Sequence, residues 1–430
     1  MTEPRIKRKM LFAERMMYND GVTPFNGLFP LRIRGVLTRE QLQHALKRLQ
    51  EKHPVLAAAV TVDGKGMPWF ESTVPEAAIP IRIAERCSDE MWKEETVKEW
   101  NTGFNAQNGP LIRLVWIRGT ALSELLLVFH HCMCDGGSAL ALVKEFLLLM
   151  DQPDADIGRE RVFTGLADVV PASVLHNRKK ILRARFLGKA GYLLLHALPL
   201  RKRTIDRGPD YLLNWKLSEE ETRQLLRNCK AIGATVNTVI SLALLSAFAS
   251  VRGKKAFNKI TCPVEIRKYA PEIREDAMFA FGLMLVLSMD KAAGLDFATR
   301  AQRMQALASK RLARLNAYDS LMMFEYAHPV LPRMIDFLKY GKSTNDCMFS
   351  NLGLLNIPAG YRHFTVDTIF SPSVIGPLGN PTTLISSTFK KQLDFSFVSS
   401  EGYIPYTEAV AIKKTLMGLL LRLQPDRDPD

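Results

Sequence analysis

Apolar and polar positions predict two strand–helix units that repeat each other along the chain. Each unit has a strand-like run, Leu31–Val36 in the first and Tyr211–Leu217 in the second. The helix that follows opens with a capping-box residue, Thr38 or Ser218. In the first helix, leucines recur at the spacing of one helical face. The repetition predicts two related halves, each built from strands and helices.

The middle of the first half has the clearest pattern. Leu111–Arg118 and Glu124–His130 are apolar, strand-like runs on either side of a Gly-Thr turn, and Ala139–Met150 is an apolar helix. The stretch 130–138, which is rich in histidine, cysteine and glycine, separates the second strand from this helix. We therefore expect 130–138 to form a loop at the edge of a sheet, where its side chains can reach a substrate.

A long run without a charged residue extends over Ala231–Val251. Serine, threonine, asparagine and glycine interrupt it, whereas a membrane span needs about 20 predominantly apolar residues. The run therefore predicts a buried core helix. No secretory signal pattern opens the chain, and we expect a cytoplasmic protein.

The composition is that of a folded, soluble protein. The chain has 430 residues, of which 47% are hydrophobic and 24% are charged, so disordered and collagen-like classes are excluded. This length allows two or three domains. The six cysteines include no C-x-x-C pair, and Cys132 and Cys134 lack the spacing of a zinc site. We therefore expect no metal.

Positive charge gathers in one segment. The formal net charge is +14, and the stretch from Leu175 to Gly208 holds ten basic residues but only one acidic residue, Asp206. These charges surround the apolar stretch Tyr192–Leu200. Three interpretations remain open: a solvated crossover between the halves, a segment that lies on an anionic membrane, or a docking site for an acidic carrier protein. No nucleic-acid-binding motif accompanies the charge, so we expect no nucleic-acid partner.

One motif points to chemistry. His130, His131, Asp135 and Gly136 stand in the pattern H-H-x-x-x-D-G. With this motif the chain resembles the superfamily of CoA-dependent acyltransferases, which includes chloramphenicol acetyltransferase, peptide-synthetase condensation domains, alcohol acetyltransferases and polyketide-associated acyltransferases. Four further stretches occur in the order typical of this superfamily: the helix 37–54 that ends in H-P, G-P-L-x-R at 109–113, P-V-x-x-R at 263–267 and S-N-L-G at 350–353.

The resemblance implies an α/β (α+β) fold of two chloramphenicol-acetyltransferase-like halves, each a mixed sheet covered by helices. It also implies a tunnel between the halves, which the thioester and the acceptor enter from opposite sides. We place the N-terminal half at residues 1–174, the basic crossover at 175–210 and the C-terminal half at 211–430. Late strands around Leu384–Ser399 are expected to cross over and complete the sheet of the first half.

The resemblance also implies roles for single residues. His131 is the general base, because an imidazole with a pKa near 7 suits removal of a proton from a hydroxyl or amine. His130 is a buried neighbour that shapes the loop. Asp135 and Arg267 form a bidentate ion pair below the loop, which fixes the orientation of His131. Gly136 follows, because the chain must turn tightly there.

Three further polar residues have expected roles. Ser350 and Asn351 are candidates for holding an oxyanion in the tunnel, and we favour Asn351. The alternative is that Asn351 caps a turn before Gly353. Ser138 is expected to be the N-cap of the helix that follows the motif.

The function implied is acyl transfer from a thioester to a hydroxyl or amine, on a lipid or a secondary metabolite. The donor is either acyl-CoA or an acyl chain on the phosphopantetheine of a carrier protein, and no cofactor stays bound. Two alternatives remain: a free-standing condensation-type domain that forms amides from carrier-bound substrates, and a catalytically silent module that docks carrier proteins. We expect a monomer, with peripheral membrane contact through residues 175–208 if the membrane interpretation holds.

Overall fold

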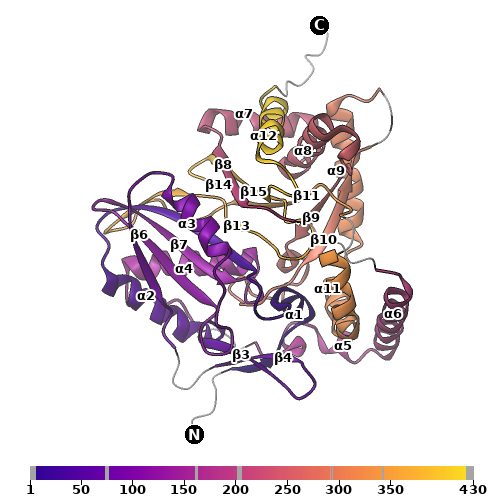
Figure 1. The fold of residues 1–430 in the computed structure, drawn as a ribbon, viewed down its shortest axis with the longest axis horizontal. Coiled ribbons are helices and arrows are strands. Elements are labelled where there is room, and N and C mark those ends of the chain that lie inside the picture. The colour runs from indigo at the N-terminus through magenta and orange to yellow at the C-terminus, as the bar shows by residue number, and fades with distance from the viewer. Residues whose placement is uncertain are drawn as a thin grey trace.

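The computed structural model describes residues 6–72, 77–159, 163–200, 206–290, 292, 294–340 and 343–422. Within these residues, two six-stranded sheets carry most of the chain, and a small three-stranded sheet lies beside the first. Figure 1 shows the first half in indigo and purple and the second half, from magenta to yellow, beside and above it. The predicted α/β class with two halves is confirmed.

The first sheet has the strand order β12-β2-β7-β6-β5, and β13 also pairs with β2. Its strands are β2 (Asn26–Arg34), β5 (Ile81–Glu85), β6 (Ile112–Arg118), β7 (Leu122–His130), β12 (Thr365–Ile369) and β13 (Ser373–Val374). Helices α2 (Arg39–Lys52) and α4 (Gly136–Asp151) pack on one face, and α3 (Met91–Trp100) packs on the other. The sheet is therefore buried on both faces, which explains why β7 is almost wholly apolar.

The second sheet has the order β10-β9-β11-β14-β15-β8. Its strands are β8 (Asp210–Lys216), β9 (Lys259–Val264), β10 (Leu283–Ser288), β11 (Cys347–Leu354), β14 (Thr383–Phe389) and β15 (Gln392–Ser400). Its own core includes residues of α7 (Glu219–Ile232), α8 (Val236–Arg252), α9 (Phe297–Ala313) and α12 (Tyr406–Leu421). The repeated strand–helix unit is thus confirmed, as β2 with α2 and as β8 with α7.

Shorter elements complete the chain. The small sheet consists of β1 (Lys7–Lys9), β3 (Ala58–Val62) and β4 (Pro68–Ser72). The remaining helices are α1 (Phe12–Tyr18), α5 (Ala172–Leu175), α6 (Arg178–Ala197), α10 (Ala317–Glu325) and α11 (Leu331–Tyr340). The basic crossover is therefore largely helical, although its residues 201–205 lie outside the described residues.

The predicted core helix in the long uncharged run is confirmed as α8. Among the described residues, the stretch Val236–Lys255 alone is long and apolar enough to cross a membrane, and 56% of its most apolar window is buried within the protein. Ten residues of α8 are buried, and eight of them are apolar residues that belong to the second core. Packing inside the protein accounts for its apolar composition.

The expectation that strands around Leu384–Ser399 cross to the first sheet is wrong. Those strands are β14 and β15, which form a hairpin inside the second sheet. The strands that cross are β12 and β13, both paired with β2. The physical reason is burial: Val366 and Ile369 of β12 complete the core of the first half, whereas a tight turn at Lys390 and Lys391, both at positive φ, keeps β14 and β15 together.

The crossing segment also joins the two halves through a shared apolar layer. Trp92 of α3 stacks on Phe370 with ring centroids 4.0 Å apart. The same cluster takes in Leu212 of β8 and Val398 of β15, together with residues of β6 and β7. The halves therefore meet across a continuous buried core.

Asp394 holds the crossing segment to the second sheet. Its carboxylate accepts hydrogen bonds from the backbone N–H of Ser371 at 2.6 Å and from Nδ2 of Asn214 at 3.0 Å. Ser371 Oγ donates to the carbonyl of Asp394 at 2.8 Å. Burial raises the pKa of Asp394 from 3.8 to about 6, against the lowering effect of these hydrogen bonds.

This raised pKa predicts a pH effect on stability. The folded protein holds the Asp394 proton more tightly than the unfolded chain, so this stabilisation is present below about pH 4 and is lost as pH rises through 6. We expect Asp394→Asn to gain about 3 kcal/mol relative to the wild type between acidic and neutral pH. Urea unfolding across this range measures it, with exposed Asp154→Asn as the control. Parallel stability curves for Asp394→Asn and the wild type would contradict the assignment.

Candidate active site

The motif loop begins where β7 ends and closes where α4 starts. His130 is the last residue of β7, and Gly136 is the first residue of α4. Asp135 is the N-cap of α4, because its side chain accepts a hydrogen bond from the backbone N–H of Ser138 at 2.9 Å. The expectation that Ser138 is the N-cap is therefore wrong: an aspartate three residues earlier already supplies the acceptor, and the Ser138 hydroxyl is used elsewhere.

His131 lies half-buried at the start of the loop with one ring nitrogen engaged. Its Nδ1 is 2.8 Å from the carbonyl oxygen of Cys134, a contact that requires Nδ1 to carry the proton. Its backbone N–H donates to the carbonyl of Phe25 at 2.7 Å, and the Phe25 ring meets the imidazole edge-on at 5.5 Å. The neutral ring then presents Nε2 as an acceptor. Burial lowers the pKa of His131 despite the opposing effects of Cys134 and Asp135, which favours this neutral form.

His130 is buried and has a different environment. It is 4% exposed, and its Nδ1 accepts the backbone N–H of Cys132 at 3.3 Å. The rings of Tyr18 and Phe104 flank it, with centroids 6.2 and 6.3 Å away. Burial lowers the pKa of His130 to about 4, so the ring is neutral at pH 7. This placement agrees with a residue that shapes the loop.

Asp135 and Arg267 form the ion pair that connects the loop to the second half. Arg267 lies just beyond β9, and its Nη1 is 3.1 Å from Oδ1 and 3.0 Å from Oδ2 of Asp135. Their side chains are only 7% and 13% exposed. The pair therefore works at reduced dielectric, where an ion pair has strong orienting power. The backbone N–H of Asp135 also donates to the carbonyl of Phe279, in the same C-terminal region.

The geometry of the pair differs from the parallel, two-nitrogen arrangement that the sequence suggested. One guanidinium nitrogen serves both carboxylate oxygens, because the other N–H groups have partners of their own. Nη1 also meets Glu265 at 3.0 Å, Nη2 donates to Ser138 Oγ at 2.7 Å and to the carbonyl of Ala277 at 3.1 Å, and Nε donates to the carbonyl of Arg274 at 3.2 Å. Burial alone would lower the pKa of Arg267, but the two carboxylates outweigh it and raise the pKa.

Glu265 and Ser138 are site residues that sequence reasoning missed as partners of Arg267. Glu265 occupies a variable position of the P-V-x-x-R pattern, two residues before the arginine. Its carboxylate also accepts the backbone N–H of Arg267 at 3.0 Å, which fixes the short turn from which the guanidinium extends. The sequence signal that could have identified Glu265 as this partner is a carboxylate two residues from an arginine in a turn.

The motif glycines matter for space and not for a left-handed turn. Gly136 is the first residue of a right-handed helix and is not among the glycines at positive φ, so the expectation of a tight turn there is wrong. A Cβ on Gly136 would lie 3.0 Å from Leu352 of β11. A Cβ on Gly137 would lie 2.6 Å from Glu265 Oε2 and 2.8 Å from Arg267 Nη1. Gly137 therefore makes room for the Asp135–Arg267–Glu265 cluster.

Ser350 and Asn351 lie in β11 beside β14, in a stretch where the strand register shifts. Asn351 Oδ1 accepts the backbone N–H of Gly353 at 2.9 Å, and Gly353 has a φ of 69°. This contact agrees with the alternative interpretation, in which Asn351 caps a turn before Gly353. Among the described residues, neither Ser350 nor Asn351 hydrogen-bonds to His131. Leu352 brings the strand against Gly136, so β11 does approach the motif.

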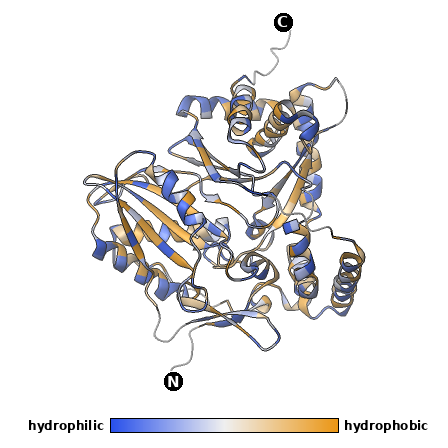
Figure 2. Cartoon of the chain, in the orientation of Figure 1, coloured by the Kyte–Doolittle hydropathy of each residue, from blue (hydrophilic) through white to orange (hydrophobic). Residues whose placement is uncertain are grey.

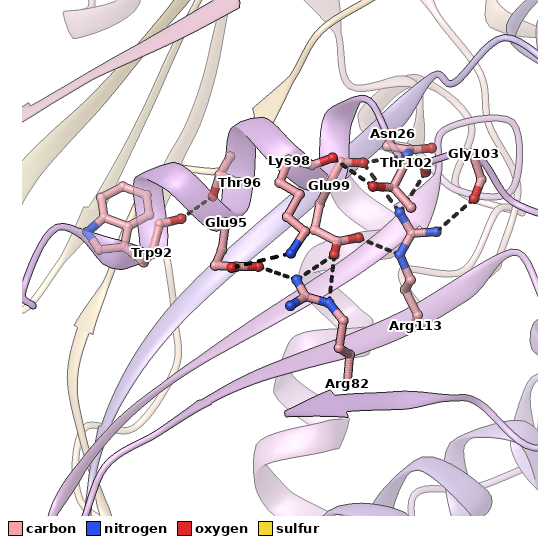
Figure 3. Close-up of polar contacts among 10 residues, drawn as sticks. All are labelled: Asn26, Arg82, Trp92, Glu95, Thr96, Lys98, Glu99, Thr102, Gly103 and Arg113. Carbon is pink, nitrogen blue, oxygen red and sulfur yellow. Dashed lines mark hydrogen bonds and ion pairs between the residues drawn. The ribbon is translucent and has the colours of Figure 1, made fainter. Parts of the chain in front are cut away.

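A second set of contacts supports the motif, and it is centred on Arg113, the arginine of the G-P-L-x-R stretch. Figure 3 shows its guanidinium reaching the end of α3, where it pairs with Glu99 and donates to the carbonyls of Thr102 at 2.7 Å and Gly103 at 3.3 Å. The same guanidinium lies 4.1 Å from the centroid of the Phe104 ring, which in turn flanks His130. Arg113 thereby holds the loop that packs behind the motif.

The other polar side chains around the end of α3 also have several hydrogen-bond or ion-pair partners each. Asn26, which stands opposite His130 in the β2–β7 pairing, donates to the carbonyls of Glu99 and Thr102 at 2.8 and 2.9 Å. Arg82 pairs with Glu95 and with Glu99, the same glutamate that Arg113 contacts (Figure 3). A buried glutamate shared by two arginines fixes the end of α3 relative to the sheet.

The described residues contain no group of three or more histidine, cysteine, aspartate or glutamate side chains that could hold a metal ion. Cys132 and Cys134 are fully buried in the core of the first half, and burial raises the pKa of both thiols well above its usual range. A cavity of about 350 Å³ lies elsewhere, between β10 and α9, and is lined by Val264, Met284, Leu285, Val286, Arg311, Leu312 and Leu315.

Known proteins resemble this chain in sequence over part of its length and in fold over nearly all of it. The family described as "Condensation domain" matches residues 6–154, which include the whole motif. A plipastatin synthase of Bacillus subtilis (strain 168) is 31% identical over 140 residues, which cover 32% of this chain and 5% of that protein. Bacitracin synthase 2 of Bacillus licheniformis is 26% identical over 149 residues, which cover 33% of this chain and 6% of that protein. The chain thus spans only a few per cent of the length of the curated relatives it matches.

The likeness in fold extends over nearly the whole chain. The trichothecene 15-O-acetyltransferase TRI3 of Fusarium sporotrichioides superposes with a TM-score of 0.72 at 13% identity, covering 97% of this chain and 95% of that one. The first condensation domain of the CDA synthetase superposes with a TM-score of 0.70 at 14% identity, covering 98% and 97%. These findings agree with the resemblance found in the sequence: residues 6–154 match the condensation-domain family, and the fold is one that condensation domains and acyltransferases share.

The buried ion pair makes a stability prediction. Removing one partner leaves the other charge buried, which typically costs about 3–5 kcal/mol, so Asp135→Ala should lower the free energy of unfolding by that amount. Denaturant titration measures it. Glu85→Ala is the control, because it removes the acid of the exposed Arg118–Glu85 pair and should cost about 1 kcal/mol or less. Equal losses in the two variants would show that the Asp135–Arg267 pair has no special weight.

The glycine geometry makes a second prediction. Gly137→Ala should displace Arg267 and Glu265 and reduce stability by about 1–3 kcal/mol, the usual cost of overpacking. Gly136→Ala meets only the end of the Leu352 side chain and should cost less. Thermal unfolding of both variants compares them. A larger loss in Gly136→Ala than in Gly137→Ala would refute this interpretation of the loop.

Proposed function

We propose that this protein is an acyltransferase that moves an acyl group from a thioester to a hydroxyl or amine, with His131 as general base. The observation that carries the proposal is the 2.8 Å contact between His131 Nδ1 and the carbonyl of Cys134. Because this contact occupies Nδ1 as a donor, Nε2 keeps its lone pair for an incoming proton. The match of the motif region to the condensation family and the shared fold support it.

The chemistry follows from this arrangement. The acceptor oxygen or nitrogen attacks the thioester carbonyl carbon while Nε2 of His131 takes its proton, which gives a tetrahedral intermediate and an imidazolium. When the intermediate collapses, the C–S bond breaks and the imidazolium returns the proton to the leaving thiolate. The products are an ester or amide and a free thiol, and His131 is neutral again. Attack by the acceptor itself means that no acyl-enzyme forms.

The neighbouring residues have positioning roles in this proposal. Asp135 does not take the proton, because both of its oxygens face Arg267 and one also accepts from Ser138. It fixes the turn that presents the Cys134 carbonyl to His131. His130 stays neutral and buried. Asn351 remains our candidate for an oxyanion donor, through its side-chain N–H₂, since its carbonyl oxygen is used by Gly353.

The donor is acyl-CoA or an acyl group on the phosphopantetheine of a carrier protein. The thioester and the acceptor would enter a tunnel between the halves from opposite sides. The alternatives are a free-standing condensation-type domain that makes amides and a silent docking module. An accessible histidine with a free Nε2 is what catalysis requires and what a docking module does not need, so we favour the enzyme. No metal or resident cofactor takes part in the proposed reaction.

Replacing His131 tests the base directly. His131→Ala should lower kcat by a factor on the order of 10²–10⁴ without a change in folding, because it removes the proton acceptor and no buried charge. Mass spectrometry of products from pooled acyl-CoAs and loaded carrier proteins, mixed with pooled hydroxyl and amine acceptors, supplies the assay. His44→Ala, at an exposed position of α2, is the matched control. Near-full turnover by His131→Ala, or a trapped covalent acyl-enzyme, would contradict the mechanism.

The pH profile is a separate test. Because burial lowers the pKa of His131 below its ordinary 6.5, the base stays deprotonated into mildly acidic solution. The acid limb of kcat/KM should therefore have its midpoint below pH 6.5, with a plateau through neutral pH. A midpoint at or above pH 7 would assign the base to another group.

A further inference from the structure

Helix α6, in the basic crossover, has an outer face that nothing in the described structure covers. It runs along the edge of the molecule beside α11 (Figure 1), and apolar and polar residues alternate along it (Figure 2). Leu182, Phe186 and Leu193 are 64%, 72% and 59% exposed. They recur at the spacing of one helical face, which they share with basic side chains. We call this set the outer face of α6: Lys179, Leu182, Arg183, Phe186, Lys189 and Leu193.

The opposite face of α6 already packs against the protein. Ala184 and Gly188 are its buried residues, and a Cβ on Gly188 would lie 2.5 Å from the carbonyl oxygen of Tyr326. Arg333 of α11 donates to the carbonyls of Leu195 and Leu198 at 3.1 and 2.8 Å. The helix is therefore held in place by small residues and backbone contacts. The leucines and phenylalanine of the outer face are not part of any core in the described structure.

The charge of α6 has a single sign. Between Arg178 and Ala197 the sequence has six lysines and arginines and no aspartate or glutamate. Lys180 pairs with Asp319 at 2.7 Å, and Arg185 lies over the ring of Tyr326 at 5.4 Å. The other four, Arg178, Lys179, Arg183 and Lys189, are exposed and form no ion pair with any residue that the structure describes.

We propose that the outer face of α6 binds an anionic lipid surface and lies in the plane of the interface. Charge complementarity and exposed apolar bulk act together here: unpaired basic side chains alternate with large apolar ones on one solvent-facing stripe, which is the pattern of interfacial helices. Six charges prevent the helix from spanning a bilayer. An acidic protein would satisfy the charges but would need a groove for Leu182, Phe186 and Leu193. A lipid surface satisfies both, since apolar side chains enter below the phosphates.

This inference is independent of the proposed acyl transfer. It follows from the surface of α6 alone, and a protein with no activity could still bind lipid. Solvent exposure of the apolar face distinguishes it from the solvated-crossover interpretation, in which the leucines of this segment would pack on the protein's own core.

Vesicle flotation tests the proposal. The intact protein should float with vesicles of phosphatidylcholine that contain about one third phosphatidylglycerol, but not with pure phosphatidylcholine, and about 0.5 M salt should release much of it. A charge variant changes Arg178, Lys179, Arg183 and Lys189 to glutamine, and an apolar variant changes Leu182, Phe186 and Leu193 to serine. Each should reduce the partition coefficient on the order of a hundredfold or more.

Matched controls separate α6 from a general surface effect. One control changes exposed basic residues elsewhere to glutamine, namely Lys47, Lys230, Lys254 and Lys255, and the other changes exposed apolar residues Val36, Val62 and Leu226 to serine. Both controls should float like the wild type. Circular dichroism verifies that every variant is folded. If a folded α6 variant floats as well as the wild type, or if the wild type does not float, the proposal is overturned.

A site-specific probe reports insertion. Cys87 is the exposed cysteine, and the other five are buried, so Cys87→Ser with Phe186→Cys allows selective labelling by a polarity-sensitive fluorophore. Anionic vesicles should shift its emission to the blue, whereas the same label at Leu226→Cys on α7 should not respond. A response at Leu226 and none at Phe186 would overturn the proposal. If the wild type ignores vesicles but binds a loaded carrier protein through these basic residues, the segment is a protein-docking site instead.

Discussion

The ion pair between Asp135 and Arg267 joins the motif loop of the first half to the second half of the chain. Asp135 caps α4 by accepting the backbone N–H of Ser138, and it also receives the guanidinium, so one carboxylate fixes the end of the loop in two ways. Arg267 is held in turn by Glu265 and by backbone carbonyls of the 274–277 segment. The orientation of His131 depends on this arrangement, because its Nδ1 contacts the carbonyl of Cys134, the residue directly before Asp135.

A second network fixes the other end of the site. Arg113 and Asn26 bind the carbonyls at the end of α3, and Phe104 in that segment packs against His130. Both networks place buried charges in contact with several partners, as desolvated charges require. One network therefore contacts the residue beside the Cys134 carbonyl that His131 meets, and the other contacts His130, the residue directly before His131.

Much of the fold was predictable from the sequence, because local patterns and motif order carry it. The strands on either side of 119–120, the repeated strand–helix units and the core helix α8 follow from hydrophobic periodicity and capping. The identity of the crossing strands did not follow. Pairing of β12 with β2 joins residues more than 300 positions apart, and no local pattern encodes such a contact.

The candidate site, like the fold, could be predicted from the sequence only in part. Motif resemblance led to His131, Asp135 and Arg267, but it misjudged why Gly136 is a glycine and what Ser138 does. Both depend on atoms from distant segments, namely Leu352 above Gly136 and the Arg267 guanidinium beside Ser138. Glu265 was overlooked for the same reason. Residue identity is visible in a sequence, whereas the space around a residue is set by tertiary contacts.

Catalysis as proposed requires that His131 be neutral at pH 7, protonated on Nδ1 and open on Nε2. Long-range ¹H–¹⁵N correlation spectra of the protein labelled at its eight histidines measure this state directly, with His131→Gln to assign the signal. We predict a neutral imidazole with the Nδ1–H tautomer, which becomes protonated only below pH 6.5. A His131 that carries its proton on Nε2, or that is an imidazolium at pH 7, would contradict this mechanism.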